Sequence, residues 1–150
     1  MTHKESAILH AGLIARRLGG GWRGVLLQGP SGAGKSDLAL RSLAEGFRLV
    51  ADDRVILWVS SGRLFGRAPD SLHGALEVRN LDVVRQPALP MAPVSLVVRS
   101  GPGERIPQLQ AIELLGLLVP LLELDLRELS APAKLSRALL LFDGADKRGI

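Results

Sequence analysis

Short apolar runs separated by glycine, proline and charged residues dominate the first two thirds of the chain. Four of these runs are five or six residues long and rich in branched aliphatic side chains: Gly24–Gln28, Phe47–Ala51, Val55–Ser60 and Val94–Arg99. Runs of this length and composition are typical of buried β-strands rather than helices. Ser6–Ala15 carries alternating short apolar runs and predicts one or two further strands.

Two stretches place their apolar residues at helical spacing instead. Asp37–Glu45 predicts a helix with one apolar face, formed by Leu38, Ala39, Leu43 and Ala44. A second helix is predicted from about Ala131 to Phe142, with an apolar stripe formed by Ala131, Leu135, Ala138, Leu139 and Phe142. The charged residues 143–150 that follow are predicted to form a mobile tail.

The turn residues between the strands indicate a mixed sheet. Ser61-Gly62 separates Val55–Ser60 from Arg63–Gly66, which is hairpin spacing. Leu76–Arg79 and Val83–Arg85 are shorter strand-like pieces. No helical pattern lies between residues 49 and 65, where a βαβαβ array would need a helix. We therefore predict one α/β domain over residues 1–150, built on a mixed β-sheet.

One segment of this pattern has the sequence of a phosphate-binding loop. Gly29-Pro30-Ser31-Gly32-Ala33-Gly34-Lys35-Ser36 matches G-x-x-x-x-G-K-[ST] in full, with a predicted strand before it and a predicted helix after it. The glycines let backbone N–H groups turn toward a polyphosphate, and the helix adds the positive end of its dipole. Lys35 is placed to bridge the terminal phosphates and Ser36 to hold magnesium. The chain is predicted to bind ATP with Mg²⁺.

A pair of carboxylates, Asp52 and Asp53, follows the next predicted strand, Phe47–Ala51. Since consecutive elements usually lie beside each other, we expect this strand to neighbour the one that leads into the phosphate loop. A carboxylate at its end would then face the terminal phosphate and orient Mg²⁺ or accept a proton. A polar turn between two strands is the alternative interpretation.

Four further residues are candidates for the functional site, but the sequence pattern around them does not decide their role. Glu77 and Arg79 should share one face of a short strand, which fits a solvated ion pair as well as a site. His10 lies beside apolar residues, where a structural role is common. Arg105 follows a Gly-Pro-Gly loop, a suitable place for a mobile arginine that stabilises charge.

Composition narrows the classes of partner. The formal net charge is +4, but the basic residues are scattered and aromatic residues are rare, so nucleic-acid binding is not expected. The chain has no cysteine, which excludes disulfides and thiolate metal sites. The longest apolar segment, Leu114–Leu122, is too short to span a bilayer. No secretory signal is visible, and we predict a cytoplasmic protein with no membrane partner.

Four stretches of the chain together resemble the catalytic domain of HPr kinase/phosphorylase, the bacterial enzyme family that phosphorylates a serine of the phosphocarrier protein HPr. They are His10-Ala11-Gly12, the phosphate loop, Arg48-Leu49-Val50-Ala51-Asp52-Asp53, and Leu76-Glu77-Val78-Arg79-Asn80-Leu81. The third is similar to the family's R-L-V-A-D-D stretch, and the fourth to its signature strand. The likeness covers most of residues 8 to 120.

The resemblance implies a fold, a reaction and a set of roles. The fold would be the P-loop domain of the HPr kinase and phosphoenolpyruvate carboxykinase type, and the reaction ATP- and Mg²⁺-dependent phosphorylation of an HPr-like protein. Asp53 would be the base, and Glu77 would join Ser36 as a magnesium ligand. The rest of the catalytic site would be Lys35, His10, Asp52, Arg79 and Arg105. The family also implies a homo-oligomer, a hexamer.

The chain also departs from the family pattern. Family members commonly carry an additional N-terminal domain, and this chain resembles the short α-proteobacterial form, which begins close to the catalytic domain. Asn80 and Asp82 stand where the family has glycines, and the basic Gly-Arg-Asn loop tied to dephosphorylation has no match. Phosphorylase activity therefore stays open. Two alternative functions are a small-molecule P-loop kinase and a non-catalytic nucleotide-dependent switch.

Overall fold

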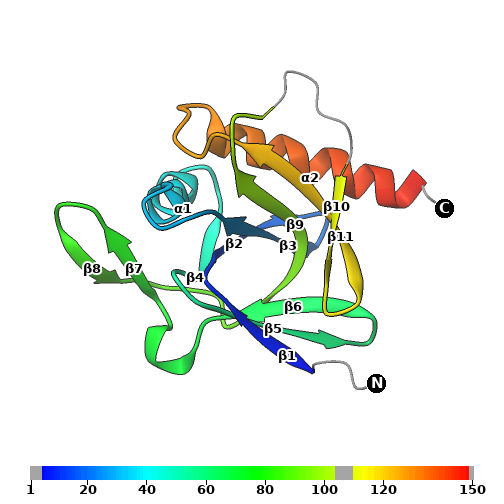
Figure 1. The fold of residues 1–150 in the computed structure, drawn as a ribbon, viewed down its shortest axis with the longest axis horizontal. Coiled ribbons are helices and arrows are strands. Elements are labelled where there is room, and N and C mark those ends of the chain that lie inside the picture. The colour runs from blue at the N-terminus through cyan, green and yellow to red at the C-terminus, as the bar shows by residue number, and fades with distance from the viewer. Residues whose placement is uncertain (1–4, 104–109, 149–150) are drawn as a thin grey trace.

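A mixed β-sheet forms the centre of the structure (Figure 1). The computed structural model describes residues 5–103 and 110–148 of the 150-residue chain. The main path of the sheet runs in the order β1-β5-β6-β9-β3-β2-β4, and β11 joins it at β9 while pairing with β10 on its other side. The strands are β1 Ser6–Leu9, β2 Gly12–Leu18, β3 Gly21–Gln28, β4 Arg48–Ala51, β5 Val55–Ser60, β6 Arg63–Arg67, β9 Ala92–Ser100, β10 Gln110–Leu114 and β11 Leu117–Leu124.

Three neighbouring strands of this sheet are parallel. Leu26 of β3 pairs with Val97 of β9, and Val97 pairs in turn with Leu121 of β11, both in parallel register. The other pairings are antiparallel, as the predicted mixed sheet requires. Because β3, β9 and β11 run in the same direction, their carboxyl ends meet at one edge of the sheet. The phosphate loop begins at this edge, directly after Gln28.

The central strands are buried on both faces, which explains why they are continuous apolar runs in the sequence. Val25 and Leu27 of β3 face a core that includes Leu38 and Leu135 of the helices. Leu26, between them, faces the other core, with side chains of β5, β6 and β11. The alternation follows the period of two of a β-strand.

Two helices cover one face of the sheet (Figure 1). α1 spans Lys35–Leu43 and α2 spans Ala131–Arg148. Leu38, Leu135 and Leu139, which belong to the predicted apolar stripes of the two helices, are buried. α2 continues six residues beyond its predicted end at Phe142, so the helix prediction was too short. Residues 149–150 lie outside the described residues, and the mobility of the tail stays a prediction.

The order of the strands corrects one expectation. β4 was predicted to lie beside β3, the strand that leads into the phosphate loop, and this prediction was wrong. β2 and β3 form a hairpin through the turn at Gly19 and Gly20, so β2 occupies that side of β3 and β4 pairs with β2 instead. β4 is therefore one strand further from the loop than expected.

A separate hairpin projects from the main sheet beside α1 (Figure 1). It consists of β7, Ala75–Val78, and β8, Asp82–Arg85, and follows a 3₁₀ turn at Asp70–Leu72. The two strands confirm the prediction of short strands at Leu76–Arg79 and Val83–Arg85. Leu76 is fully buried against α1, which fixes the base of the hairpin on the helix, whereas all of β8 is exposed.

Candidate active site at the phosphate loop

A cavity of about 670 Å³ lies where the phosphate loop, the end of β4 and the base of the β7–β8 hairpin meet. The loop contributes Ser31, Gly32 and Gly34–Ser36 to its wall. The other walls contain five of the residues singled out in the sequence, namely His10, Asp52, Asp53, Glu77 and Arg79. The structure therefore brings together residues that lie up to 69 positions apart in the chain.

The phosphate loop has the backbone that its sequence predicted. Gly32 and Gly34 have φ angles of 85° and 102°, in the left-handed region that side chains other than glycine rarely adopt. α1 begins at Lys35, so the N–H groups of its first turn lie at the cavity wall. Lys35 is buried, and its Nζ donates to the carbonyl oxygens of Gly29 at 2.5 Å and Pro30 at 3.0 Å. The ammonium group is thereby held inside the loop.

A chain of hydrogen bonds links α1, β4 and β7 below the loop. The hydroxyl of Ser36 donates to Oδ1 of Asp52 at 2.7 Å, and the backbone N–H of Glu77 donates to Oδ2 of the same carboxylate at 3.0 Å. Asp52 is buried, so both of its oxygens are satisfied away from solvent. Asp52 thus reaches the phosphate loop although β4 does not neighbour β3.

Asp53 lies on a tight turn that directs it into the cavity. The N–H of Arg54 donates to the carbonyl of Asp52 at 2.8 Å, and the residue between them, Asp53, has a φ of 71°. A three-residue turn with positive φ is strained, and such strain is common at functional positions. Oδ1 of Asp53 lies 2.9 Å from Nε2 of His10, and its side chain is 58% exposed.

Glu77 and Arg79 both line the cavity from the β7–β8 hairpin. Their side chains are exposed, while Leu76 is buried on the opposite face, as the predicted alternation requires. Arg105, the last predicted site residue, lies outside the described residues.

The oxygen donors of the cavity fit a magnesium ion. Mg²⁺ prefers hydroxyl, carboxylate and phosphate oxygens and is commonly bound through one or two protein side chains plus substrate phosphates. Ser36 uses its proton toward Asp52 and keeps its oxygen lone pairs, and the carboxylate of Glu77 lines the same cavity. Among the described residues, no three His, Cys, Asp or Glu side chains could hold a metal by themselves.

Sequence reasoning missed one functional candidate, Arg127. It follows β11 and lines the cavity, and its guanidinium donates to the carbonyl of Gly32 in the phosphate loop. Its position follows from topology, because β11 is parallel to β9 and β3 and ends at the same edge. The missing signal was β11 itself, since no strand was predicted from its sequence.

Residues 9–88 match the family model described as the HPr serine kinase C-terminal domain. The chain belongs to this family. The matched segment contains the phosphate loop and the five other cavity residues that the sequence singled out, and it ends before β9. Arg127 lies outside it.

Curated relatives and a solved structure agree with this membership. The HPr kinase/phosphorylase of Clostridium tetani is 46% identical over 66 residues, which are 44% of this chain and 22% of the relative. That of Clostridium beijerinckii is 46% identical over 61 residues, which are 41% of this chain and 20% of the relative. The chain thus matches about a fifth of the length of these relatives.

The solved structure of the HPr(Ser) kinase/phosphatase from Coxiella burnetii superposes with a TM-score of 0.77. The two sequences are 21% identical, and the match covers 95% of this chain and 93% of the other. The similarity confirms the predicted fold class, including the β10–β11 and α2 region that the family model does not reach. No helix in the described part of the chain has the length and apolar character needed to cross a membrane.

Proposed function

We propose that this chain is a protein serine kinase that transfers the γ-phosphoryl group of ATP, with Mg²⁺, to a serine of an HPr-like phosphocarrier protein. The observation that carries the proposal is the position of Asp53. Its carboxylate faces the same cavity as the phosphate loop and is 58% exposed, so an incoming hydroxyl has access to it. The names of the relatives supply the identity of the acceptor.

In the proposed reaction the serine oxygen attacks the γ-phosphorus of ATP while Asp53 accepts the hydroxyl proton. The bond between the γ-phosphorus and the β–γ bridging oxygen breaks, and ADP leaves with the electron pair. Phosphoryl transfer of this kind requires positioning and charge stabilisation more than covalent chemistry from the protein. His10, 2.9 Å from Oδ1 of Asp53, and Arg54, whose Nε lies 3.6 Å from Oδ2, help to orient the carboxylate.

Three groups of residues provide the rest of the chemistry in this proposal. The phosphate loop holds the polyphosphate, with Lys35 and Arg79 as cations near its negative charge. Ser36 and Glu77 hold Mg²⁺, and Asp52 fixes both by its hydrogen bonds to the Ser36 hydroxyl and the Glu77 backbone. When bound, Mg²⁺ neutralises charge on the phosphate oxygens.

Intact-protein mass spectrometry tests the proposal directly. HPr from the same genome is incubated with this protein, ATP and Mg²⁺, beside an otherwise identical reaction with Asp53→Asn. We expect the wild type to add one phosphoryl group, located on a serine by fragmentation, and the variant to add none. If the protein binds ATP but HPr gains no phosphoryl group, the result would contradict the proposal. Adding phosphate and removing ATP would then test the reverse reaction, which stays a prediction.

The two alternative functions predict different outcomes. A small-molecule kinase would leave HPr unmodified and consume ATP with a low-molecular-weight acceptor. A nucleotide switch would bind ATP and ADP with no turnover at all.

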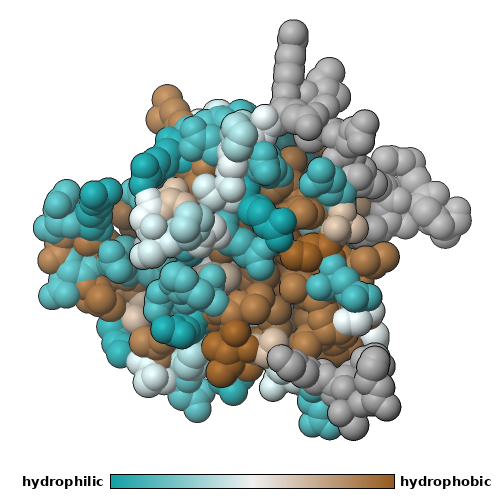
Figure 2. Space-filling model, in the orientation of Figure 1, coloured by the Kyte–Doolittle hydropathy of each residue, from teal (hydrophilic) through white to brown (hydrophobic). Residues whose placement is uncertain are grey.

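We also propose that the protein forms a homo-oligomer, as the family resemblance implies. Leu118 on β11 and Leu140 and Leu141 on α2 are 75%, 54% and 62% exposed. Figure 2 shows hydrophobic surface in the region where β10 and β11 lie. Large exposed apolar side chains of this kind are common at subunit interfaces. Light scattering that finds a monomer at micromolar concentration would contradict this.

A further inference from the structure

Arg127 comes from a part of the chain that carries no recognised motif, and yet it reaches the phosphate loop. It lies in the turn between β11 and α2, 91 residues after Ser36. The parallel order β3-β9-β11 explains this, because it brings the end of β11 to the edge of the sheet where the loop begins.

The side chain of Arg127 lies against the loop backbone. Its Nη2 donates to the carbonyl of Gly32, and its stem passes so close to Gly34 that a Cβ atom there would lie 3.2 Å from Cγ of Arg127. Glycine is therefore favoured at position 34 for two reasons. It adopts a φ of 102°, and it leaves room for the side chain of Arg127. The arginine is exposed and lines the cavity together with Lys35 and Ser36.

Arg41 of α1 holds the turn that carries Arg127. Its Nη2 donates to the carbonyl of Leu126 at 2.5 Å, and its Nη1 donates to the carbonyl of Glu128 at 3.0 Å. Its Nε donates to Asp37 on the preceding helical turn at 2.8 Å. These two carbonyls belong to the residues on either side of Arg127, so one guanidinium fixes the backbone of the turn on both sides.

Two acidic residues of the same turn complete this support. Oδ1 of Asp125 accepts the backbone N–H of Arg127 at 3.0 Å, and the carboxylate of Glu128 accepts a hydrogen bond from Lys134 of α2. The turn that carries Arg127 is thus tied to α1 and α2, while the exposed guanidinium of Arg127 remains at the solvent-facing side of the loop. An arrangement with a fixed backbone and an exposed charged tip is suited to a ligand.

We propose that Arg127 is a nucleotide-binding residue whose guanidinium donates to the polyphosphate of the bound nucleotide, and that Arg41 is the residue that positions it. The inference rests on the proposed function only in taking the site to bind a nucleoside polyphosphate. A guanidinium has five N–H donors in a planar fork that matches phosphate oxygens. Among the described residues, only the carbonyl of Gly32 accepts a hydrogen bond from the guanidinium of Arg127. Lys35, the cation of the loop itself, already donates to the carbonyls of Gly29 and Pro30.

The test measures nucleotide binding, so its result does not depend on whether HPr is the acceptor. ADP with Mg²⁺ is titrated by calorimetry into the wild type, Arg127→Gln and Arg127→Lys. We expect the affinity for ADP to fall about tenfold or more in Arg127→Gln, because this variant loses charge-assisted hydrogen bonds to the phosphates. Arg127→Lys keeps the charge and should recover part of the loss. Binding of ADP at wild-type affinity by Arg127→Gln would overturn the proposal.

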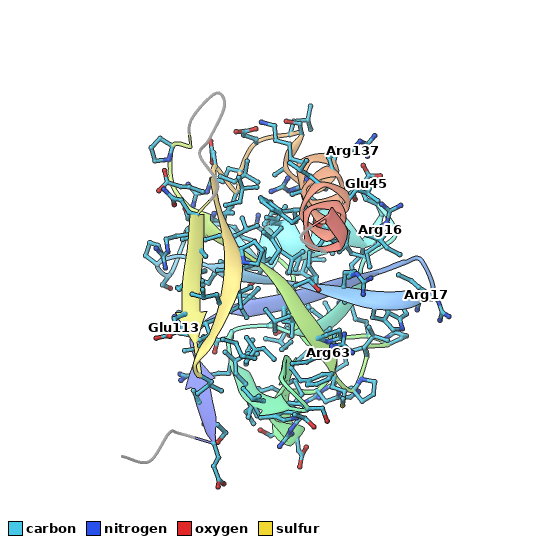
Figure 3. The ribbon with its side chains drawn as sticks, turned by 90° about the vertical axis from the view of Figure 1, so that its right-hand side faces the viewer. Arg16, Arg17, Glu45, Arg63, Glu113 and Arg137 are labelled. Carbon is cyan, nitrogen blue, oxygen red and sulfur yellow. The ribbon has the colours of Figure 1, made fainter. Side chains whose placement is uncertain are left out.

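A matched control is the arginine on the outer surface of α2, Arg137, which Figure 3 labels. Arg137→Gln removes the same charge and should leave the affinity for ADP within about twofold of wild type, since surface substitutions away from a site have small effects. Arg127→Gln should also weaken the dependence of ADP affinity on salt, which Arg137→Gln should not. If the salt dependence of ADP affinity is unchanged in Arg127→Gln, Arg127 has a merely structural role and the proposal is wrong.

A titration with inorganic pyrophosphate tests whether Arg127 contacts the phosphates or the nucleoside of the nucleotide. If Arg127 donates to the polyphosphate, Arg127→Gln weakens pyrophosphate and ADP by similar factors. Weaker ADP binding with unchanged pyrophosphate binding would place the contact on the nucleoside and overturn the assignment to phosphate. Lys35→Ala, measured in the same series, should weaken binding by about tenfold or more, which confirms that the titration reports on the loop.

The role of Arg41 is tested by a double-mutant cycle. If Arg41 acts through Arg127, then Arg41→Gln weakens ADP binding, and adding Arg41→Gln to Arg127→Gln causes little further loss. Full additivity of the two effects would contradict a positioning role. Circular dichroism and thermal unfolding of each variant identify any that fail to fold. The milder Arg41→Lys, which cannot donate to two carbonyls in a fixed fork, replaces Arg41→Gln in that case.

Discussion

The two sides of the cavity differ in how firmly their polar side chains are held. On one side, which we call the donor half, Lys35, Ser36 and Asp52 form hydrogen bonds of 2.5–3.0 Å, and Lys35 and Asp52 are buried. On the other side, the acceptor half, His10 and Asp53 bond to each other at 2.9 Å and are 45% and 58% exposed. The donor half is preformed, whereas the acceptor half is open.

This difference matches the two substrates of the proposed reaction. A nucleotide polyphosphate needs fixed donors around it, and these can be preorganised in a single protein. A serine on a protein surface must approach the base from solvent, so the base has to remain accessible until the partner covers it. We therefore expect substitutions in the donor half to change nucleotide and metal binding, and substitutions in the acceptor half to change transfer alone.

The largest expected effect is that of Asp53→Asn on transfer. The amide cannot accept the serine proton, and loss of a general base lowers rates by about 10²–10⁴-fold. The rate of HPr phosphorylation is measured with saturating ATP and Mg²⁺. The control is Asp70→Asn, a fully exposed aspartate outside the cavity, which should leave the rate unchanged. Wild-type transfer by Asp53→Asn would remove this residue from the mechanism.

A smaller effect, of a different kind, is expected from Asp52→Asn. Both oxygens of Asp52 accept hydrogen bonds, from Ser36 and from the backbone of Glu77, and an asparagine would turn an N–H₂ group toward one of these donors. The Mg²⁺ concentration for half-maximal activity should rise about 10–100-fold, as for other residues that orient metal ligands. The measurement is a Mg²⁺ titration of the transfer rate at fixed ATP. An unchanged requirement for Mg²⁺ would break the assignment of Asp52 to the donor half.

The smallest effect is expected from His10→Gln. The bond between His10 and Asp53 is exposed, and exposed pairs contribute little, so transfer should fall about two- to fivefold with ATP affinity unchanged. Steady-state kinetics with HPr as the varied substrate provides the measurement, and His73→Gln, an exposed histidine outside the cavity, is the control. A loss as large as that of Asp53→Asn would show that His10 takes part in the chemistry itself.

The parts of this molecule that sequence could predict are those with local causes. The phosphate loop depends on glycines at fixed spacing, and the strand before it and the helix after it follow from apolar patterns within about ten residues. Asp52 and Asp53 were identified because they end a buried strand, and the resemblance to the HPr kinase family connected them with His10 and Glu77. The mixed sheet followed from the hairpin spacing of β5 and β6.

The parts that sequence could not predict depend on contacts between distant residues. Nothing near β4 shows that β2 takes the place beside β3, because strand pairing is decided by the whole sheet. β11 was missed because Pro120 weakens the strand pattern. In the structure, Pro120 precedes the pairing of β11 with β9, which begins at Leu121. Without β11, the position of Arg127 at the phosphate loop had no basis in the sequence.

The measurement that tests this account most directly is the affinity of Asp53→Asn for ATP with Mg²⁺, determined by calorimetry beside Lys35→Ala. The account predicts that Asp53→Asn, which cannot transfer, binds ATP within about twofold of wild type, because its carboxylate serves the acceptor, while Lys35→Ala loses about tenfold or more. A loss of ATP affinity in Asp53→Asn as large as that in Lys35→Ala would contradict the division of the cavity into two halves.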